Sequence, residues 1–259
     1  MDLGLQGRKA IICASSRGLG LACAQALAEA GCEIVINGRN PDHVAAAEAS
    51  IFEATGAKIT AVVADVGTPE GRAALLAACP DADILVNNNG GPPIKDFRKL
   101  SLADLTAGTN ANMFAPIAMI QGLIDGMIAR KFGRIINITS GSVKAPMVGL
   151  DLSSGARAGL TAFLAGVARD VAHANVTINN LLPGPFETDR LAAGSKAQAA
   201  LKGISVEEIQ AQRTASIPAR RFGQPDEFGK LCAFVASEHA GYITGQNFLI
   251  DGGAFPGAF

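Results

Sequence analysis

Short runs of Ile, Val and Leu alternate with longer alanine-rich segments along the whole chain. Seven of these runs are strand candidates, at residues 9–15, 33–38, 59–64, 83–87, 134–139, 176–182 and 247–251. The segments between them carry apolar residues at helical spacing, at about 18–31, 41–55, 69–79, 101–130, 151–173 and 225–237. Strands made almost entirely of aliphatic residues are buried on both faces, as in a parallel sheet that helices cover on each side. The alternation therefore predicts a doubly wound α/β fold with a seven-stranded parallel sheet.

The length of the chain predicts a single domain over residues 1–259. A chain of 259 residues lies within the range of one large α/β unit, and no Pro-, Gly- or Ser-rich linker divides it. One stretch, 187–216, departs from the alternation because it is rich in Ala, Lys, Gln and Glu and stands between the last two strand candidates. We predict that this stretch forms a mobile helical lid.

Charge and cysteine usage exclude several classes of protein. The 22 Lys and Arg against 23 Asp and Glu, with no basic run longer than two residues, do not make the basic face of a nucleic-acid-binding protein. The five cysteines are scattered without a C-x-x-C pair, which argues against a disulfide framework or a metal site and favours a reducing compartment. No apolar run approaches the ~18 residues of a membrane span. We therefore expect a cytoplasmic protein that binds no metal, nucleic acid or membrane.

The loop after the first strand candidate predicts a dinucleotide site. Residues 15–20 read SSRGLG and lead into an alanine-rich helix, the context in which backbone N–H groups can hold a pyrophosphate. The alternative is that the loop is only a tight connection. Arg39 stands just beyond the second strand, where a carboxylate would favour NAD(H) and an arginine suits a 2′-phosphate. Together with Arg17 it favours NADP(H), unless both arginines are ordinary surface residues.

An ordered set of motifs covers nearly the whole chain. It comprises residues 13–20 (CASSRGLG), Asp65-Val66, 86–90 (VNNNG), Asn112-Met113, 138–140 (ITS), Pro183-Gly184 with Thr188, and 242–246 (YITGQ) ahead of 251–253 (DGG). With these motifs the chain resembles the short-chain dehydrogenase/reductase family, and within it the branch that includes 3-oxoacyl-acyl-carrier-protein reductases. The resemblance implies a Rossmann-type sheet with a nicotinamide cofactor at its carboxyl edge. It also implies a homo-oligomer, commonly a tetramer, built through the long helices that carry Asn112 and Ser153 and through the C-terminus.

The same resemblance implies a set of cofactor contacts. They are Ala14, Ser15, Ser16, Arg17, Gly18, Leu19 and Gly20 in the loop, Arg39, Asp65 and Val66 at the adenosine, Asn87 near the ribose, and Pro183, Gly184, Phe186 and Thr188 by the nicotinamide. Ala14 departs from the family pattern, which has a glycine there. We expect a negative φ at this residue, because an alanine then fits without strain.

The family's catalytic set is an Asn, a Ser, and a Tyr followed four residues later by a Lys. Asn112 and Ser140 fill the first two places, but the usual spacing puts Ser153 in the Tyr place and Arg157 in the Lys place. No shift of register restores the tyrosine, because the only one in the chain is Tyr242, which belongs to a separate C-terminal motif.

These two replacements change the available chemistry. A phenol has a reference pKa of ~10 and can be tuned towards neutrality, whereas a serine hydroxyl is a far weaker acid. Arg157 lies one helical turn from Ser153 and can bind ribose hydroxyls, but its pKa above ~12 prevents it from relaying a proton. Ser140, Ser153 and Arg157 could still stabilise an oxyanion. Water, Lys144 or Asp151 could supply the proton, although Lys144 reads equally as a surface residue and Asp151 as a helix-start charge.

Three functions remain open from the sequence. The first is an NADPH-dependent reductase of a small carbonyl substrate, with 3-oxoacyl compounds among the candidates and with an altered catalytic site. The second is an NADP(H)-binding protein with lost turnover that acts as a regulatory or assembly subunit. The third keeps the cofactor but runs another reaction, such as dehydration or epimerisation. Retention of Asn112 and Ser140 favours an enzyme.

Overall fold

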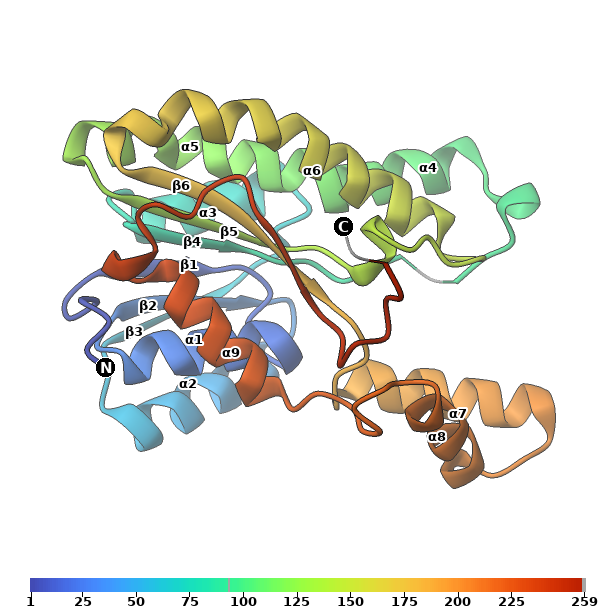
Figure 1. The fold of residues 1–259 in the computed structure, drawn as a ribbon. Coiled ribbons are helices and arrows are strands. Elements are labelled where there is room, and N and C mark those ends of the chain that lie inside the picture. Colours follow the sequence, from blue (N-terminus) through green and yellow to red (C-terminus); the bar gives the residue numbers. More distant parts are fainter. Residues whose placement is uncertain (93, 258–259) are drawn as a thin grey trace.

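The computed structural model describes residues 1–92 and 94–257 and contains one seven-stranded sheet (Figure 1). Every neighbouring pair is parallel, in the order β3-β2-β1-β4-β5-β6-β7. The strands are β1 (Lys9–Ile12), β2 (Glu33–Gly38), β3 (Ile59–Val63), β4 (Ile84–Asn87), β5 (Gly133–Ile138), β6 (Val176–Pro183) and β7 (Asn247–Ile250). The predicted doubly wound fold is confirmed, and all seven strands lie where the aliphatic runs place them.

Helices cover both faces of the sheet, as predicted (Figure 1). They are α1 (Gly18–Glu29), α2 (Pro41–Thr55), α3 (Pro69–Ala78), α4 (Leu102–Thr109), α5 (Ala115–Arg130), α6 (Asp151–Val171), α7 (Asp189–Lys202), α8 (Val206–Ala215) and α9 (Pro225–Ala236). One buried core joins the sheet to α1, α2 and α9, and a second core joins its other face to α3, α5 and α6. The stretch predicted as a lid folds into α7 and α8, which project from the sheet.

The helix predicted over 101–130 is not one regular helix. A π-helical turn, Asn110–Phe114, separates α4 from α5. Pro116 explains the position of this turn, because proline has no N–H to donate to the carbonyl four residues earlier, which is that of Asn112.

The stretch Leu102–Arg130 is also long and apolar enough, by length and composition alone, to cross a membrane. The sequence prediction overlooked this, but α5 packs on the sheet through buried Met119, Leu123 and other side chains.

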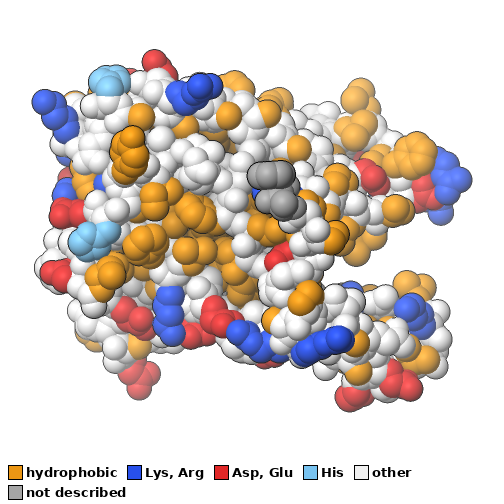
Figure 2. Space-filling view, viewed as in Figure 1, with side chains coloured by type: hydrophobic (Ala, Val, Ile, Leu, Met, Phe, Trp, Pro, Cys, Tyr) orange, Lys and Arg blue, Asp and Glu red, His pale blue; other side chains and the backbone are white. Residues whose placement is uncertain are grey.

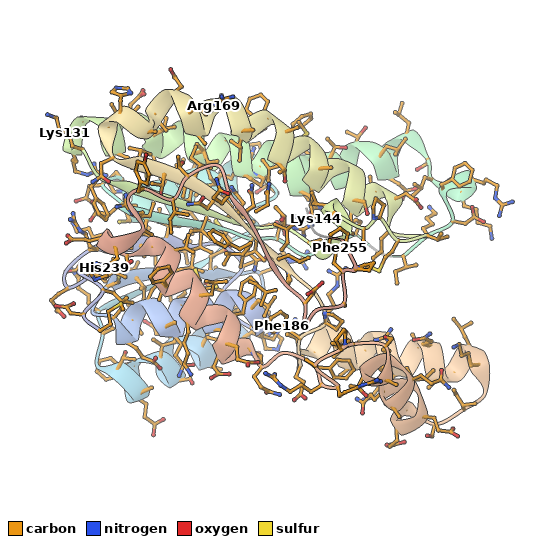
Figure 3. All side chains as sticks on the ribbon, viewed as in Figure 1. Lys131, Lys144, Arg169, Phe186, His239 and Phe255 are labelled. Carbon is orange, nitrogen blue, oxygen red and sulfur yellow. The ribbon has the colours of Figure 1, made fainter. Side chains whose placement is uncertain are left out.

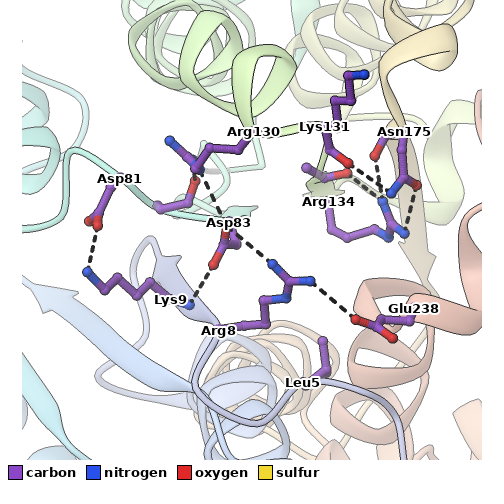
Figure 4. A network of polar contacts seen from close by, with 12 residues as sticks. Leu5, Arg8, Lys9, Asp81, Asp83, Arg130, Lys131, Arg134, Asn175 and Glu238 are labelled. Atoms are coloured by element: carbon purple, nitrogen blue, oxygen red, sulfur yellow. Dashed lines mark hydrogen bonds and ion pairs between the residues drawn. The ribbon is translucent and has the colours of Figure 1, made fainter.

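A polar network closes the amino edge of the sheet, opposite the predicted site (Figure 4). Asp83, just before β4, accepts a hydrogen bond from the Lys9 N–H and lies 3.9 Å from Arg8 and 3.6 Å from Arg130. Arg134 on β5 is only 1% exposed, yet its guanidinium donates to the carbonyls of Ser237, Gly133 and Asn175 and to the Asn175 side chain. These contacts hold the first residues of β1, β4 and β5 together, so the network has a structural role.

Candidate active site

The predicted site residues meet at the carboxyl edge of the sheet. The loops after β1, β4, β5 and β6 lie there, and β1 and β4 are adjacent strands whose connections leave in opposite directions. Such a point is where open α/β sheets bind ligands. Figure 2 shows that the molecule is hollowed on this side between two projecting lobes, which Figure 1 identifies as the α4 region and the pair α7–α8.

The glycine loop departs from expectation at Ala14. Its φ is +45°, in the left-handed region, so the expected negative φ is wrong. Two contacts hold the residue in place, since its N–H donates to Asn37 Oδ1 at 2.9 Å and its carbonyl accepts from Asn88 Nδ2 at 3.1 Å. A Cβ on Gly20 would lie only 2.4 Å from the Ala14 carbonyl oxygen, so the loop and the first turn of α1 pack backbone to backbone. The loop thus holds Ala14 in the left-handed region at the cost of backbone strain.

We expect Ala14→Gly to stabilise the protein by up to about 1 kcal/mol, because left-handed φ costs an alanine about 1–2 kcal/mol and glycine returns part of this through unfolded-state entropy. Thermal unfolding measures the change. The matched control is Ala49→Gly on the exposed side of α2, which should lower stability by about 0.5–1 kcal/mol. Equal losses in both variants would contradict the strain at Ala14.

The two serines of the loop have different surroundings. Ser15 is fully buried, and its hydroxyl donates to the Ile12 carbonyl and accepts from the Asn37 N–H, so it fixes the loop against β2. Ser16 reaches the end of β2, where a side chain on Gly38 would clash with it. The hydroxyl of Ser16 therefore lies beside Gly38, the last residue of β2 and the one before Arg39.

Both predicted phosphate-binding arginines are exposed, and each faces an acid. Arg39 lies 3.8 Å from Asp65, whose carboxylate also accepts from the Gly67 N–H. Arg17 lies 3.5 Å from Asp189 at the start of α7. The second contact joins the glycine loop to the helical insertion. Val66, next to Asp65, is buried and packs in the core beneath α3 and α5.

The strip after β6 lies against the glycine loop. Thr188 caps α7, and a Cβ on Gly18 would come within 3.7 Å of its methyl group. The Gly184 N–H donates to the Ile250 carbonyl, which ties the strip to β7. The ring of Phe186 is buried and packs edge-on against Phe228 with centroids 5.4 Å apart, so it anchors the strip in the core (Figure 3).

Asn112 lies in the π-helical turn and lines one pocket with Asn87 and Arg157. Its Nδ2 donates to the Gly108 carbonyl at 3.1 Å, whereas its buried Oδ1 has no hydrogen-bond partner among the described residues. A buried acceptor of this kind is costly unless something donates to it. The orphaned oxygen therefore marks the pocket as a place for a polar ligand.

Ser153 and Arg157 lie one turn apart on α6, and Arg157 lines the same pocket as Asn112. The Arg157 Nε donates to Ser153 Oγ at 3.3 Å and its Nη1 donates to the Ile138 carbonyl at 2.6 Å. Arg157 is only 8% exposed. Burial, with a smaller effect from Arg190, lowers the pKa of its guanidinium to about 10, so it stays cationic at neutral pH. Ser140, at the end of β5, accepts from the Ser142 N–H.

The two alternative proton donors lie at the mouth of the site. The Lys144 ammonium lies 5.8 Å from the centre of the Phe255 ring (Figure 3). Phe255 belongs to the C-terminal segment. Asp151 is the first residue of α6, and its carboxylate accepts from the Gly149 N–H. The structural reading of Asp151 as a helix-start charge is confirmed.

A ladder of asparagines beneath the site was missed by the sequence analysis. Four strands contribute one side chain each in register, and each Nδ2 donates to the next Oδ1 at 2.9, 3.0 and 2.9 Å, in the order Asn87, Asn137, Asn180 and Asn247. A slip of one residue would break the ladder, so it fixes the register of β4 to β7. The signal was available, because an asparagine interrupts each of these aliphatic runs.

Comparison with known proteins identifies the family. The family model described as enoyl-(acyl carrier protein) reductase matches residues 13–254. The 3-oxoacyl-[acyl-carrier-protein] reductase of Aquifex aeolicus is 32% identical over 98% of this chain and 100% of its own length. The chain belongs to the short-chain dehydrogenase/reductase family. The NADPH-dependent reductase BacG of Bacillus subtilis is 31% identical, over 95% of this chain and 97% of its own. L-sorbose reductase from Gluconobacter frateurii, solved with NADPH and L-sorbose, superposes with a TM-score of 0.92 at 30% identity, over 97% and 98% of the two chains.

Proposed function

We propose that this short-chain dehydrogenase/reductase is an NADP(H)-dependent oxidoreductase that reduces a small carbonyl substrate at the Asn112–Ser140–Ser153–Arg157 site. The observation that carries the proposal is the buried, cationic Arg157, which donates a hydrogen bond to the Ser153 hydroxyl and lines the Asn112 pocket at the carboxyl edge. When bound, the nicotinamide supplies hydride to the substrate carbon. The relatives, which are named as NADPH-dependent or solved with NADPH, support the cofactor.

The loop and the end of β2 fit a 2′-phosphorylated dinucleotide. Gly18, with a φ of +59°, lets the loop turn into α1, and Gly20 lets that helix pack on the Ala14 carbonyl, so the N–H groups of the first turn of α1 would face a pyrophosphate. Ser16, Arg17 and Arg39 offer a hydroxyl and two guanidinium groups near the ribose position. Asn87 would lie under the ribose.

We expect NADPH to bind about ten- to a hundredfold more tightly than NADH, since a charged hydrogen bond contributes about 1.5–3 kcal/mol. Titration of the free protein with each cofactor measures the ratio. Arg39→Gln should remove most of the preference, whereas Arg169→Gln, on the exposed side of α6, should leave it unchanged. Equal affinities for the two cofactors in the wild-type protein would contradict the assignment.

The catalytic groups stabilise negative charge without donating a proton readily. Ser140, Ser153 and Arg157 can hydrogen-bond to an oxygen that becomes negative as hydride arrives. Neither an aliphatic hydroxyl nor an arginine is an effective acid near neutral pH. Water that enters from the open cleft would then supply the proton, so reduction of an ordinary ketone should be slow.

The lack of an effective acid at the site favours a second candidate reaction, which is reduction of a carbon–carbon double bond conjugated to a carbonyl. Hydride then adds to the distant carbon, and the negative charge spreads onto the carbonyl oxygen as an enolate. An enolate is stable enough to be held by hydrogen-bond donors alone and to take its proton later, on carbon, from water. A site with Ser153 and Arg157 in place of an acid suits this order of events.

Steady-state oxidation of NADPH tests the function. The panel should contain simple ketones, 3-oxoacyl thioesters and 2-enoyl thioesters, with NADPH binding measured in parallel. Turnover on 3-oxoacyl substrates supports carbonyl reduction, and turnover on 2-enoyl substrates alone supports the second candidate. Tight NADPH binding with no turnover on any substrate would instead favour a regulatory or assembly subunit.

An oligomer, expected to be a tetramer, would cover the outer face of α5 and α6. Phe114 and Phe163 are each about half exposed there, at 52% and 51%, and apolar side chains exposed together usually mark interfaces. Light scattering at micromolar concentration should give a mass above that of the 26.4 kDa chain. A monomeric mass, unchanged in Phe163→Ser, would contradict this prediction.

All five cysteines are free and buried, which suits the reducing, cytoplasmic compartment that we also propose.

A further inference from the structure

Exposed arginines of the protein pair with carboxylates in two different ways. Arg221 donates two short hydrogen bonds to the Glu227 carboxylate, at 2.7 and 2.6 Å. Arg17 and Arg39 approach their carboxylates only to 3.5 and 3.8 Å, and neither contact is a hydrogen bond. The two arginines that we assign to the cofactor phosphate are therefore each held near an acid, while their side-chain donors stay unengaged within the described part of the chain.

The acid that faces Arg17 comes from the helical insertion. Asp189 is the first residue of α7, directly after the capping residue Thr188. The side chains of Arg17 and Asp189 are 59% and 79% exposed, so solutes can reach both. Among the ion pairs of the described residues, this is the one that joins the insertion to the rest of the protein. Asp189 thus reaches the glycine loop from a separate element.

A phosphate would be a stronger partner for Arg17 than this carboxylate is. An exposed ion pair without hydrogen bonds contributes little free energy, because water screens it. A phosphate monoester carries a charge of about −1.5 to −2 at neutral pH, and its oxygens match the planar guanidinium with two parallel hydrogen bonds. Arg17 is therefore expected to leave Asp189 when a phosphate comes within reach.

We infer that Asp189 competes with the cofactor 2′-phosphate for Arg17, and so sets how strongly the protein prefers NADPH to NADH. This inference rests on the proposed function and concerns the regulation of its cofactor site. In the free protein Asp189 holds the Arg17 guanidinium at the loop. NADPH takes the guanidinium away from Asp189, whereas NADH has no 2′-phosphate and leaves the pair intact. Asp189 is thus a specificity-determining residue that lowers the preference for NADPH.

The contacts around Asp189 allow its charge to be removed cleanly. The Thr188 hydroxyl accepts from the Leu191 N–H, which caps α7. Arg190 donates to the Gly91 carbonyl at 3.3 Å, which fastens the first turn to the loop after β4. Neither contact uses the Asp189 carboxylate. Asp189→Asn should therefore keep the first turn of α7 in place and change only the charge that faces Arg17.

A double-mutant cycle on cofactor binding tests the inference. Isothermal titration calorimetry at low salt gives the dissociation constants of NADPH and NADH for the wild-type protein, Asp189→Asn, Arg17→Gln and the double variant. We expect Asp189→Asn to bind NADPH about two- to fivefold more tightly, the range that an exposed ion pair allows, and to bind NADH as the wild type does. In the Arg17→Gln background, Asp189→Asn should change neither affinity.

Glu207→Gln is the matched control. Glu207 lies in the first turn of α8, in the same insertion, and forms no ion pair with a described residue. Its neutralisation should leave both affinities unchanged. The gain in Asp189→Asn should also shrink at high salt, because salt screens exposed charges.

Four outcomes would overturn the inference. An unchanged NADPH affinity in Asp189→Asn would show that the pair costs the cofactor nothing, and a weaker one would show that Asp189 positions Arg17 for the phosphate. Equal tightening of NADPH and NADH would mean that Asp189 repels the pyrophosphate. A gain that persists in Arg17→Gln would show that Asp189 acts without Arg17. If wild-type NADPH binds no more tightly than NADH, the proposed cofactor assignment fails as well, so the two failures are distinguishable.

Discussion

Turnover on ketone substrates should rise by about 10²–10⁴ when Ser153→Tyr is combined with Arg157→Lys, because general-acid assistance typically contributes a factor of that size. The two positions are one turn apart on α6 and already contact each other at 3.3 Å, so the pair would stand where the family places its phenol and ammonium. The ammonium lowers the phenol pKa from its usual ~10 towards neutrality. Steady-state kinetics with saturating NADPH measure the change.

The pH profile separates this explanation from its rivals. The double variant should show a limb from the titrating phenol, which the wild-type profile lacks. Ser153→Tyr alone should gain less, since the guanidinium of Arg157 cannot relay a proton. Two results would count against the argument. If wild-type turnover is already fast and is abolished by Lys144→Ala, the acid has moved to the loop at the mouth of the cleft. If the double variant binds NADPH but stays inert on every carbonyl, the site performs another reaction.

The two buried arginines should respond in opposite ways to replacement by methionine. Arg134→Met is expected to destabilise the protein by about 3 kcal/mol, because it removes four hydrogen bonds from the guanidinium to Gly133, Ser237 and Asn175, each worth about 0.5–1.5 kcal/mol. Arg157→Met should leave the free energy of unfolding within about 1 kcal/mol of the wild-type value. The loss of one bond to the Ile138 carbonyl is offset by removal of a buried charge that lacks an anion.

Urea denaturation of both variants checks this contrast, with NADPH binding measured on both. The result expected is a loss of stability without loss of NADPH binding in Arg134→Met, and a loss of NADPH binding without loss of stability in Arg157→Met. If the two variants are destabilised equally, Arg157 is a structural residue and its proposed role at the site loses its main support. Functional residues often contribute little to the stability of the free protein, because their hydrogen bonds are completed only when a ligand binds.

The sequence predicted the sheet well because a strand that is buried on both faces appears as a nearly continuous run of aliphatic residues. Runs such as 133–138 and 176–183 can only be aliphatic if helices cover both sides, and the seven strands follow from them. The residues that mark the start of a helix were equally reliable. Asn40 and Thr68 cap α2 and α3, and Pro41 and Pro69 follow them directly, as helix N-termini favour.

The Ser153–Arg157 pair was identified through the family resemblance, and the i, i+4 spacing on one helix predicts that the two side chains contact each other. The sequence did not show the electrostatic surroundings of this pair. Whether an arginine at 157 is neutralised depends on which carboxylates approach it from other elements, and these lie far away in sequence, as Asp189 and Asp251 show. Only the folded chain shows each of them engaged elsewhere.

What the sequence determined by itself is therefore the order of strands and helices along the chain and the identity of the residues in the loops at the carboxyl edge. Tertiary structure decided the rest. It forced Ala14 to a φ of +45° through contacts from Asn37 and Asn88, and it aligned four asparagines into one ladder. It also brought Arg190 of α7 against the Gly91 carbonyl. These features depend on long-range contacts, and a periodic pattern records which face of an element is buried but not which partner it meets.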